Sequence, residues 1–537
     1  MSITHDEFWH LPAGVRAWQG DFAVDRLNPP VSRFLAALPL VLSGLRLEPA
    51  DDASALGIQF VASHADFQQW YVWGRCFHLA WTVATGVLIY GWALKQFGLA
   101  AARLSLLCLL ACPNVLAHGS IVTPDAAAMF GFVVTSWCLA QWGSYPTWQR
   151  AVFAGVALGF LQGIKFTGVV FGPIVLLVGA WTIYRGVSVN GQSARRGKVF
   201  GQLATILIVS LFVLAACYGF QGFGRPLGQY ALQSESLRGW QQRLTPLAAL
   251  PIPLPADYLL GVDQQRFVME QQHPIFLDGQ WRVSGFLDYY PKAVLYKLSH
   301  GFQLLMALGL VAAWRFRRRG FTPAALSWWG PVAILFTLAT FSNMQLGIRY
   351  VLPIVPLGAL LAGHATRFLE PVSVPARRFL AIVTALVLIS ALRHHPHHLA
   401  YFNEYAGGPI GGRYHLLDSN LDWGQDLLRA RDFIQAHADE TPQFLYFGTV
   451  SPKQVGAAAP FPPSRAPQPG LYLISVNFVM GRPHAVWTPD ENRRSLDFQE
   501  FGYFRDFEPI GHAGYSIDIY RITTDDIRQA VLRGRTP

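Results

Sequence analysis

The sequence has few charged residues for its length. Only 14% of its 537 residues are charged, whereas 52% are hydrophobic. A soluble globular protein carries about 25% charged residues. This shortage argues against a soluble enzyme, and the long apolar runs favour a chain that folds with the lipid bilayer as its solvent.

Cysteine is also scarce, and its distribution excludes two further classes. All five cysteines lie in or beside apolar runs: Cys76, Cys108, Cys112, Cys138 and Cys217. This placement does not suit a disulfide framework, and the spacing does not match that of a zinc site. The sequence has neither an internal repeat nor a low-complexity tract.

The net charge of +10 does not by itself indicate a nucleic-acid partner. The basic residues cluster in short loops between apolar runs, as Arg315, Arg317, Arg318 and Arg319 do. Such loops are typical of the cytoplasmic face of a membrane protein. No nucleic-acid partner is therefore predicted.

Apolar runs predict about ten membrane crossings. They lie roughly at 70–94, 104–119, 126–143, 151–166, 168–184, 199–219, 298–314, 322–341, 348–366 and 379–395. If all of them cross, the basic loops share one face, which the positive-inside rule makes cytoplasmic. The short stretch 31–47 contains Arg33, Pro39 and Arg46, which favours a helix in the outer interface. If it crosses instead, the N-terminus lies inside.

This topology divides the chain into five parts. An outer loop with an acidic motif and the interfacial helix spans 1–69, membrane helices span 70–219 and 298–395, a long outer loop spans 220–297, and an extracytoplasmic α/β domain spans 396–537. In the last part, 426–438 has helical periodicity, whereas 443–450, 470–478 and 515–522 have strand patterns. The predicted fold is a polytopic α-helical membrane protein of the cell (inner or plasma) membrane with a small C-terminal α/β domain.

Ionisable residues gather at the outer ends of the predicted spans, where they are expected to face a cavity. They are Asp6, Glu7, Arg75, His118, Asp125, Lys165 and Arg349. Carboxylates beside cations suit glycosyl transfer, because a carboxylate can take the proton of the acceptor hydroxyl while cations hold the leaving phosphate. Asp6 or Glu7 is the candidate base. Lys165 and Arg349, with Arg33 or Arg75, form the candidate phosphate clamp.

Each of these residues also has a purely structural interpretation. Lys165 could reach lipid headgroups, and Arg33 and Arg75 could anchor helices at the interface. Asp125 follows a Thr-Pro pair and could cap a helix. Asp6 and its neighbour could be a solvated surface pair. The residues alone leave these interpretations open.

Five motifs occur in the order found in a known superfamily. They are Thr4-His5-Asp6-Glu7-Phe8-Trp9-His10 with the later Asn28-Pro29-Pro30; Pro113-Asn114-Val115-Leu116-Ala117-His118-Gly119 with Thr123-Pro124-Asp125; Gly163-Ile164-Lys165-Phe166-Thr167; Gly347-Ile348-Arg349-Tyr350-Val351-Leu352-Pro353; and Asp418-Ser419-Asn420-Leu421-Asp422-Trp423-Gly424-Gln425-Asp426. Together they resemble the GT-C superfamily of membrane glycosyltransferases. The resemblance is strongest to the family 39, protein-mannosyltransferase-like branch and its bacterial members that use polyprenyl-phosphate sugars.

The resemblance implies a GT-C fold and an inverting transfer of a sugar, mannose-like or another hexose or pentose, from a polyprenyl-phosphate carrier. The acceptor would be a hydroxyl of a protein, lipid or glycan outside the cytoplasm, with membrane lipids as further partners. It assigns catalysis to Asp6 as base, Glu7 and Asp125; donor phosphate binding to Lys165, Arg349, His118 and Arg75; and acceptor binding or domain docking to Asp418, Asn420, Asp422, Trp423 and Gln425. No cofactor is firmly implied, and the acidic residues are too few to support a divalent metal site.

The start of the sequence departs from the family pattern. The family places a membrane span before its Asp-Glu loop, whereas Met1 stands only a few residues before Asp6, so we expect the family's first helix to be missing from this sequence.

Two other functions are alternatives to glycosyl transfer. A transporter or flippase of lipid-linked sugars would gather its charges near the bilayer midplane. A non-catalytic assembly protein would use the outer domain to bind a partner. Neutralising Asp6 separates these functions, because only an enzyme would lose sugar transfer while staying folded.

Overall fold

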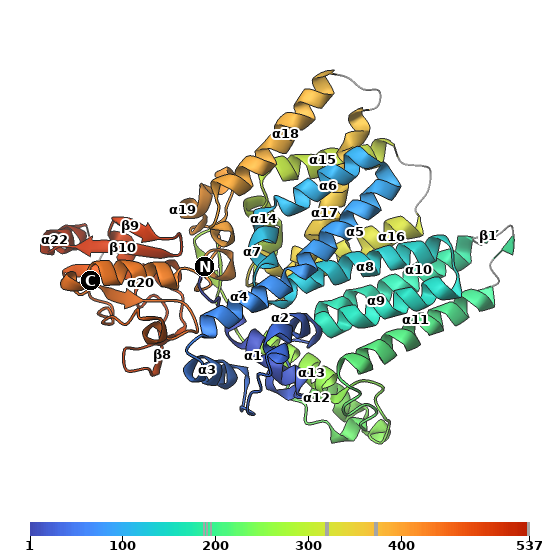
Figure 1. Ribbon diagram of the computed structural model, residues 1–537, viewed down its shortest axis with the longest axis horizontal. Coiled ribbons are helices and arrows are strands. Elements are labelled where there is room, and N and C mark those ends of the chain that lie inside the picture. Colours follow the sequence, from blue (N-terminus) through green and yellow to red (C-terminus); the bar gives the residue numbers. More distant parts are fainter. Residues whose placement is uncertain (186–187, 190–191, 194–195, 317–321, 370–373, 534–537) are drawn as a thin grey trace.

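The computed structural model describes the chain except residues 186–187, 190–191, 194–195, 317–321, 370–373 and 534–537. Its membrane helices spread out like a fan, and the C-terminal sheet lies at the opposite end of the molecule (Figure 1).

The N-terminal part forms α1 (Glu7–Trp18), α2 (Val31–Leu42) and α3 (Ala53–Ser63). The first helical group comprises α4 (Phe67–His78), α5 (Ala80–Phe97), α6 (Leu99–Leu110), α7 (Pro113–Gly119), α8 (Pro124–Ser144), α9 (Trp148–Ile164), α10 (Phe171–Arg185) and α11 (Arg196–Cys217), with the hairpin β1 (Ser188–Val189) and β2 (Gln192–Ser193). The loop after it contains α12 (Glu235–Arg243), α13 (Ala256–Glu270), β3 (Ile275–Leu277), β4 (Gln280–Arg282) and α14 (Tyr289–Lys297), and the second group comprises α15 (His300–Arg315), α16 (Pro323–Thr340), α17 (Val355–His364) and α18 (Val374–Arg393).

Most of the predicted crossings correspond to membrane-type helices. In the described part of the chain, six helical stretches are long and apolar enough to cross a membrane: Phe67–Phe97, Pro124–Ser144, Phe166–Tyr184, Arg196–Cys217, Pro323–Thr340 and Val374–Arg393. The number rises to eight if two bent pairs are counted as one span each: α6 with α7, bent by 63°, and α14 with α15, bent by 114°. The protein is therefore a multi-pass membrane protein.

The remaining two predicted crossings are not among these helices, although one of them has nearly the length of a span. The segment predicted at 151–166 is α9, whose 17 residues lie at the lower end of the ~17–25 that a crossing needs. The segment predicted at 348–366 breaks into the 3-10 turns η5 (Ile348–Tyr350) and η6 (Leu352–Ile354) followed by α17. Pro353 and Pro356 lack the N–H that a continuous helix needs, so each stands near the start of a new element.

Three glycines let α9 pack closely against α11. Gly155, Gly159 and Gly163 are spaced four residues apart and so share one face of the helix. A Cβ atom at Gly155 would stand 2.8 Å from the carbonyl oxygen of Ile206 in α11, and one at Gly163 would stand 3.0 Å from Sγ of Cys217. Small residues at such a spacing bring membrane helices together.

The C-terminal part contains a mixed four-stranded sheet, which includes the three strands predicted from the sequence. Its order is β5 (Gln443–Leu445), β6 (Gly470–Ser475), β10 (Ile517–Ile522) and β9 (Gly511–Ala513), with β5 parallel to β6 and the other pairs antiparallel. The predicted helix is α20 (Leu427–Ala436), and α19 (Gly408–Gly412), α21 (Val476–Val479), the hairpin β7 (Ala485–Trp487) and β8 (Arg493–Ser495), and α22 (Thr524–Leu532) complete the region. The strands β9, β7 and β8 were not predicted, because each has only three residues and shows no alternation in the sequence.

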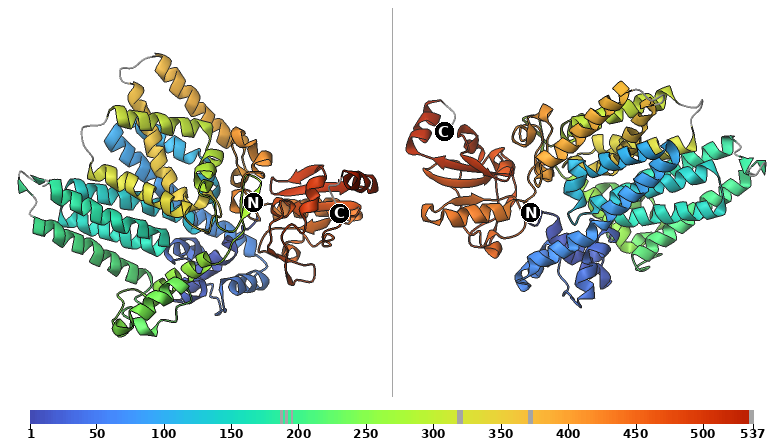
Figure 2. Two further views of the ribbon diagram at one scale, coloured as in Figure 1. Left: turned by 180° about the vertical axis from the view of Figure 1, so that it is seen from behind. Right: turned by 45° about the horizontal axis from the view of Figure 1, so that its top comes forward.

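The N-terminal end runs between the helices and the C-terminal region (Figure 2). The backbone N–H of Ser2 donates to the carbonyl of Gln425 at 2.9 Å, and that of His5 donates to the carbonyl of Trp423 at 2.8 Å. The hydroxyl of Thr449 donates to the carbonyl of His5 at 3.1 Å. These bonds fix the backbone immediately before Asp6.

Candidate functional site

The structure contains a cavity of about 750 Å³ where three distant parts of the chain meet. The N-terminal part contributes Asp6, Trp9 and residues 23–28, the loop after α11 contributes residues such as Arg225 and Gln233, and the segment before α17 contributes Arg349 and Tyr350. The three parts place a carboxylate, cations, amides and aromatic rings around one space.

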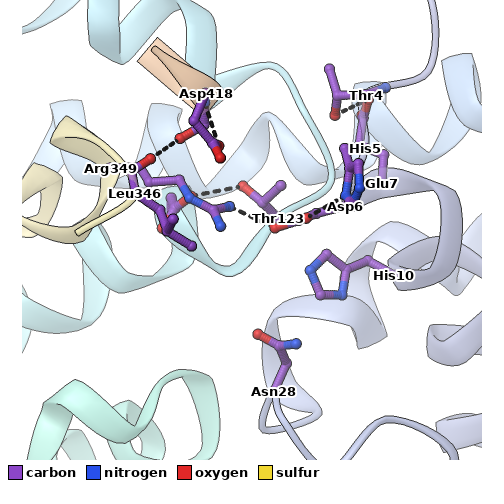
Figure 3. Close-up of polar contacts among 12 residues, drawn as sticks. Thr4, His5, Asp6, Glu7, His10, Asn28, Thr123, Leu346, Arg349 and Asp418 are labelled. Carbon is purple, nitrogen blue, oxygen red and sulfur yellow. Dashed lines mark hydrogen bonds and ion pairs between the residues drawn. The ribbon is translucent and has the colours of Figure 1, made fainter. Parts of the chain in front are cut away.

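Asp6 and Arg349 form an ion pair in the wall of this cavity. Nη1 of Arg349 lies 2.6 Å from Oδ2 of Asp6, although the residues are 343 positions apart. Figure 3 shows the two side chains reaching toward each other beside Thr123. The guanidinium also lies over the ring of Trp423, 4.3 Å from its centroid. The side chains of Asp6 and Arg349 are 18% and 14% exposed, so the pair is partly open to the cavity.

The environment keeps Asp6 ionised. Burial by itself would raise the pKa of the carboxyl, but the Arg349 guanidinium and the hydrogen-bonded ring of His5 hold that pKa well below its ordinary value. Nε of Arg349 is buried, and within the described structure it has no hydrogen-bond acceptor. The guanidinium thus has a donor that no acceptor in the described structure uses.

A second ion pair lies at the ends of α8 and α9. Nζ of Lys165 lies 2.6 Å from Oδ1 of Asp125, whose side chain is 2% exposed. Lys165 also lies over the ring of Tyr350, 5.6 Å from its centroid, and Tyr350 lines the cavity. Neither Asp125 nor Lys165 belongs to the described cavity wall, so the second pair lies next to the cavity rather than in it. His118 is buried, and its ring centroid lies 6.0 Å from that of Trp423.

The structure places Glu7 and Arg75 in a different arrangement from the one predicted. Glu7 is fully buried, and its two oxygens accept hydrogen bonds from Thr4, Arg75 and the backbone N–H of Val122. Arg75 also donates to the carbonyls of Met1 and Ser2. The predicted roles of Glu7 as base and of Arg75 as phosphate cation do not fit, because the hydrogen bonds of both side chains already hold the N-terminal end against α4.

Arg33 likewise has a structural position. Its side chain is 2% exposed, forms an ion pair with Asp25 and donates to the carbonyl of Asn28 at 2.9 Å. Asp25 also contacts the ring of His10 at 3.3 Å. The sequence alone did not indicate this network, and it did not indicate that Trp9 and Tyr350 line the cavity. The only signal for them was that they stand inside motifs quoted for other residues.

The segment from Asp418 to Gln425 docks the C-terminal region. The N–H of Asp418 donates to Oδ1 of Asn477 at 2.9 Å, its carboxylate pairs with Arg482, and the carboxyl of Asp422 is hydrogen-bonded to Ser475. Burial raises the pKa of Asp422 to about 8, and Asp426 and Asp418 nearby act in the same direction. None of the residues of this segment lines the described cavity.

The described residues include no group of three or more His, Cys, Asp or Glu side chains arranged to hold a metal ion. Asp6, Asp25 and Asp125 are each paired with a basic side chain instead.

Comparison with known proteins supports one of the predictions made from the motifs. Residues 58–216 match the model of a family described as dolichyl-phosphate-mannose-protein mannosyltransferase. The resemblance to membrane glycosyltransferases is confirmed for this segment. It includes the motifs around His118, Asp125 and Lys165. No curated protein sequence matches the chain.

Several solved structures are similar at low identity. ArnT from Cupriavidus metallidurans in the apo state is 14% identical, with 97% of this chain and 94% of that chain covered and a TM-score of 0.47. The same protein bound to undecaprenyl phosphate is 13% identical, with 98% and 95% covered and a TM-score of 0.47. The oligosaccharyltransferase of Archaeoglobus fulgidus, in complex with zinc and sulfate, is 12% identical, with 92% and 69% covered and a TM-score of 0.39.

Proposed function

We propose that the protein is an inverting glycosyltransferase that moves a sugar from a polyprenyl-phosphate carrier to an acceptor hydroxyl. The observation that carries this proposal is the Asp6–Arg349 pair in the wall of the 750 Å³ cavity. The family match over residues 58–216 supports the same class of reaction.

In this mechanism, the donor phosphate competes with Asp6 for Arg349. The guanidinium has a buried Nε without an acceptor in the described structure, and an arginine can bind phosphate with two parallel hydrogen bonds. Lys165, whose Nζ lies 5.6 Å from the centroid of the Tyr350 ring, adds positive charge. When Arg349 turns to the phosphate, Asp6 loses the partner that lowers its pKa, and the carboxylate becomes a better base.

The chemical step is a single displacement. The acceptor oxygen attacks the anomeric carbon as Asp6 takes its proton, and the bond from that carbon to the phosphate oxygen breaks with its electron pair going to the phosphate. Arg349 and Lys165 stabilise the charge that develops there. Gln229, Gln233, Gln264 and Gln265 in the cavity wall offer amides to sugar hydroxyls. A polyhydroxylated substrate therefore fits the cavity.

We place this site outside the cytoplasm, in the cell (inner or plasma) membrane. Basic residues stand at the end of α5 (Lys95), the start of α11 (Arg196), the end of α15 (Arg315) and the start of α18 (Arg377). These helix ends lie across the fan from the C-terminal region (Figure 1). The positive-inside rule puts these basic ends in the cytoplasm.

Purified protein incubated with a panel of polyprenyl-phosphate sugars and candidate acceptors tests the proposal. We expect at least one donor to release free polyprenyl phosphate in step with transfer. Arg349→Ala should weaken donor binding, whereas Asp66→Asn, at an exposed carboxylate before α4, should leave it unchanged. Movement of the lipid-linked sugar across vesicles without sugar transfer would point to a flippase instead.

A further inference from the structure

We propose that Ser419, Asn420 and Trp423 are positioning residues that set how Asp6 and Arg349 stand relative to each other. This inference rests on the proposed function of that pair. Residues that fix the pair are needed because neither Asp6 nor Arg349 lies within a long helix. Asp6 is the residue immediately before α1, and Arg349 lies in the three-residue turn η5.

The first contact holds the Arg349 side of the pair. Oδ1 of Asn420 accepts a hydrogen bond from the backbone N–H of Ile348 at 3.0 Å, and the hydroxyl of Ser419 donates to the carbonyl of Leu346. Between them, Gly347 has φ +134°, and a Cβ there would stand 2.7 Å from Oγ of Ser419. A residue with a side chain would be strained at this φ and would push the two segments apart.

The second contact holds the Asp6 side. The carbonyl of Trp423 accepts from the N–H of His5 at 2.8 Å, while the indole ring of the same residue lies under the Arg349 guanidinium. The short segment 419–423 is therefore hydrogen-bonded to the backbone next to both Asp6 and Arg349, which are far apart in the chain.

The segment that contains Ser419, Asn420 and Trp423 is itself held by further hydrogen bonds. Lys297, at the end of α14, is 1% exposed and donates through Nζ to the carbonyls of Leu399 and Asn420. Nδ2 of Asn420 donates to the carbonyl of Leu417 at 2.9 Å. From the C-terminal region, Nδ2 of Asn477 donates to the carbonyl of Asp422 at 3.1 Å. The C-terminal region thus acts on the site through these contacts, without lining the described cavity.

The test compares Asn420→Ala with Asn403→Ala in the full-length protein. Asn403 is an equally buried amide that joins the chain after α18 to the end of α14, donating to the carbonyls of Leu295 and Leu298, but none of its side-chain hydrogen bonds reaches residues 346–350. We expect Asn420→Ala to lower kcat by about 10²-fold with a far smaller change in donor KM, because misplacement by about 1 Å costs that much. Activity of Asn420→Ala should also fall on acidification toward the ordinary pKa of an aspartate, where the wild type is still active. Asn403→Ala should show neither effect.

Hydrogen exchange provides a readout that does not depend on activity. In Asn420→Ala, exchange should quicken at residues 346–350 and remain unchanged in α8 and α9. If that occurs while the wild-type protein transfers no sugar, the proposed function is wrong but the positioning contact is real. If Asn420→Ala does not fold, Ser419→Ala, which removes only one hydroxyl, should show the same effects more weakly. Equal losses in Asn420→Ala and Asn403→Ala, or unchanged exchange at 346–350, would overturn the positioning role.

Discussion

Two neighbouring carboxylates at the start of α1 have opposite surroundings. Glu7 is fully buried and bonded on both oxygens, whereas Asp6 is partly exposed in the cavity wall and shares one guanidinium. The sequence predicted that both belonged to one acidic motif, but it could not separate them. Adjacent helical residues point about 100° apart, and which one faces a cavity depends on how other helices pack. Arg349 was predicted correctly to lie near Asp6, because its motif stands out among apolar residues.

Replacing Glu7 should affect stability rather than chemistry. Glu7→Gln leaves Arg75 facing a neutral amide in a buried site, which should lower the free energy of unfolding by about 3–5 kcal/mol. Thermal unfolding of the purified variant measures this loss, with Asp66→Asn as the exposed control. A Glu7→Gln protein as stable as wild type but unable to transfer sugar would show that Glu7 acts in the reaction.

At the scale of elements, α9 is held close to α11 by glycine rather than by length. A Cβ added at Gly159 would collide with the backbone of Ser210, whereas one added at Gly172 in α10 meets nothing within 4 Å. We therefore expect Gly159→Ala to lower the yield and the unfolding temperature, and Gly172→Ala to leave both unchanged or slightly higher. Equal behaviour of the two variants would contradict the packing described for α9.

Docking of the C-terminal region should depend on pH through Asp422. Its pKa in the folded protein, about 8, lies above the ordinary value of 3.8, so the folded state binds an extra proton between these values. The stability that this proton provides is complete below the ordinary pKa and is lost as pH rises through about 8. Unfolding temperatures measured between about pH 6 and 9 should fall in the wild type and change less in Asp422→Asn. Parallel curves for the two proteins would mean that Asp422 is already ionised when folded.

At the scale of the whole molecule, apolar runs and basic loops predicted most of the architecture. Long apolar helices are set by local composition, so six predicted crossings agree with the described helices. The break at 348–366 depends on prolines and on the contact of Ile348 with Asn420, and the bend between α14 and α15 lies where Asn403 contacts Leu295 and Leu298, so neither was predicted. The order of the sheet was also out of reach, because β5, β6 and β10 pair across long stretches of chain.

The positions of the basic helix ends predict which side the C-terminal region occupies. A reporter enzyme that is active only outside the cytoplasm, fused after the last residue, should be active. The same reporter placed between α15 and α16, where basic residues cluster, should be inactive. The reverse pattern in well-expressed fusions would put the cavity on the cytoplasmic side and refute the proposed location.

Sugar transfer by Asp6→Asn tests the central claim most directly. Asparagine keeps the size of the side chain but cannot accept the proton of the acceptor hydroxyl. With a donor that the wild-type protein uses, the variant should bind polyprenyl phosphate and remain folded, yet its kcat should fall by about 10²–10⁴-fold. The wild-type product should have the anomeric configuration opposite to that of the donor. Transfer by Asp6→Asn at the wild-type rate, or a wild-type product with retained configuration, would contradict the assignment of Asp6 as the base of an inverting transfer.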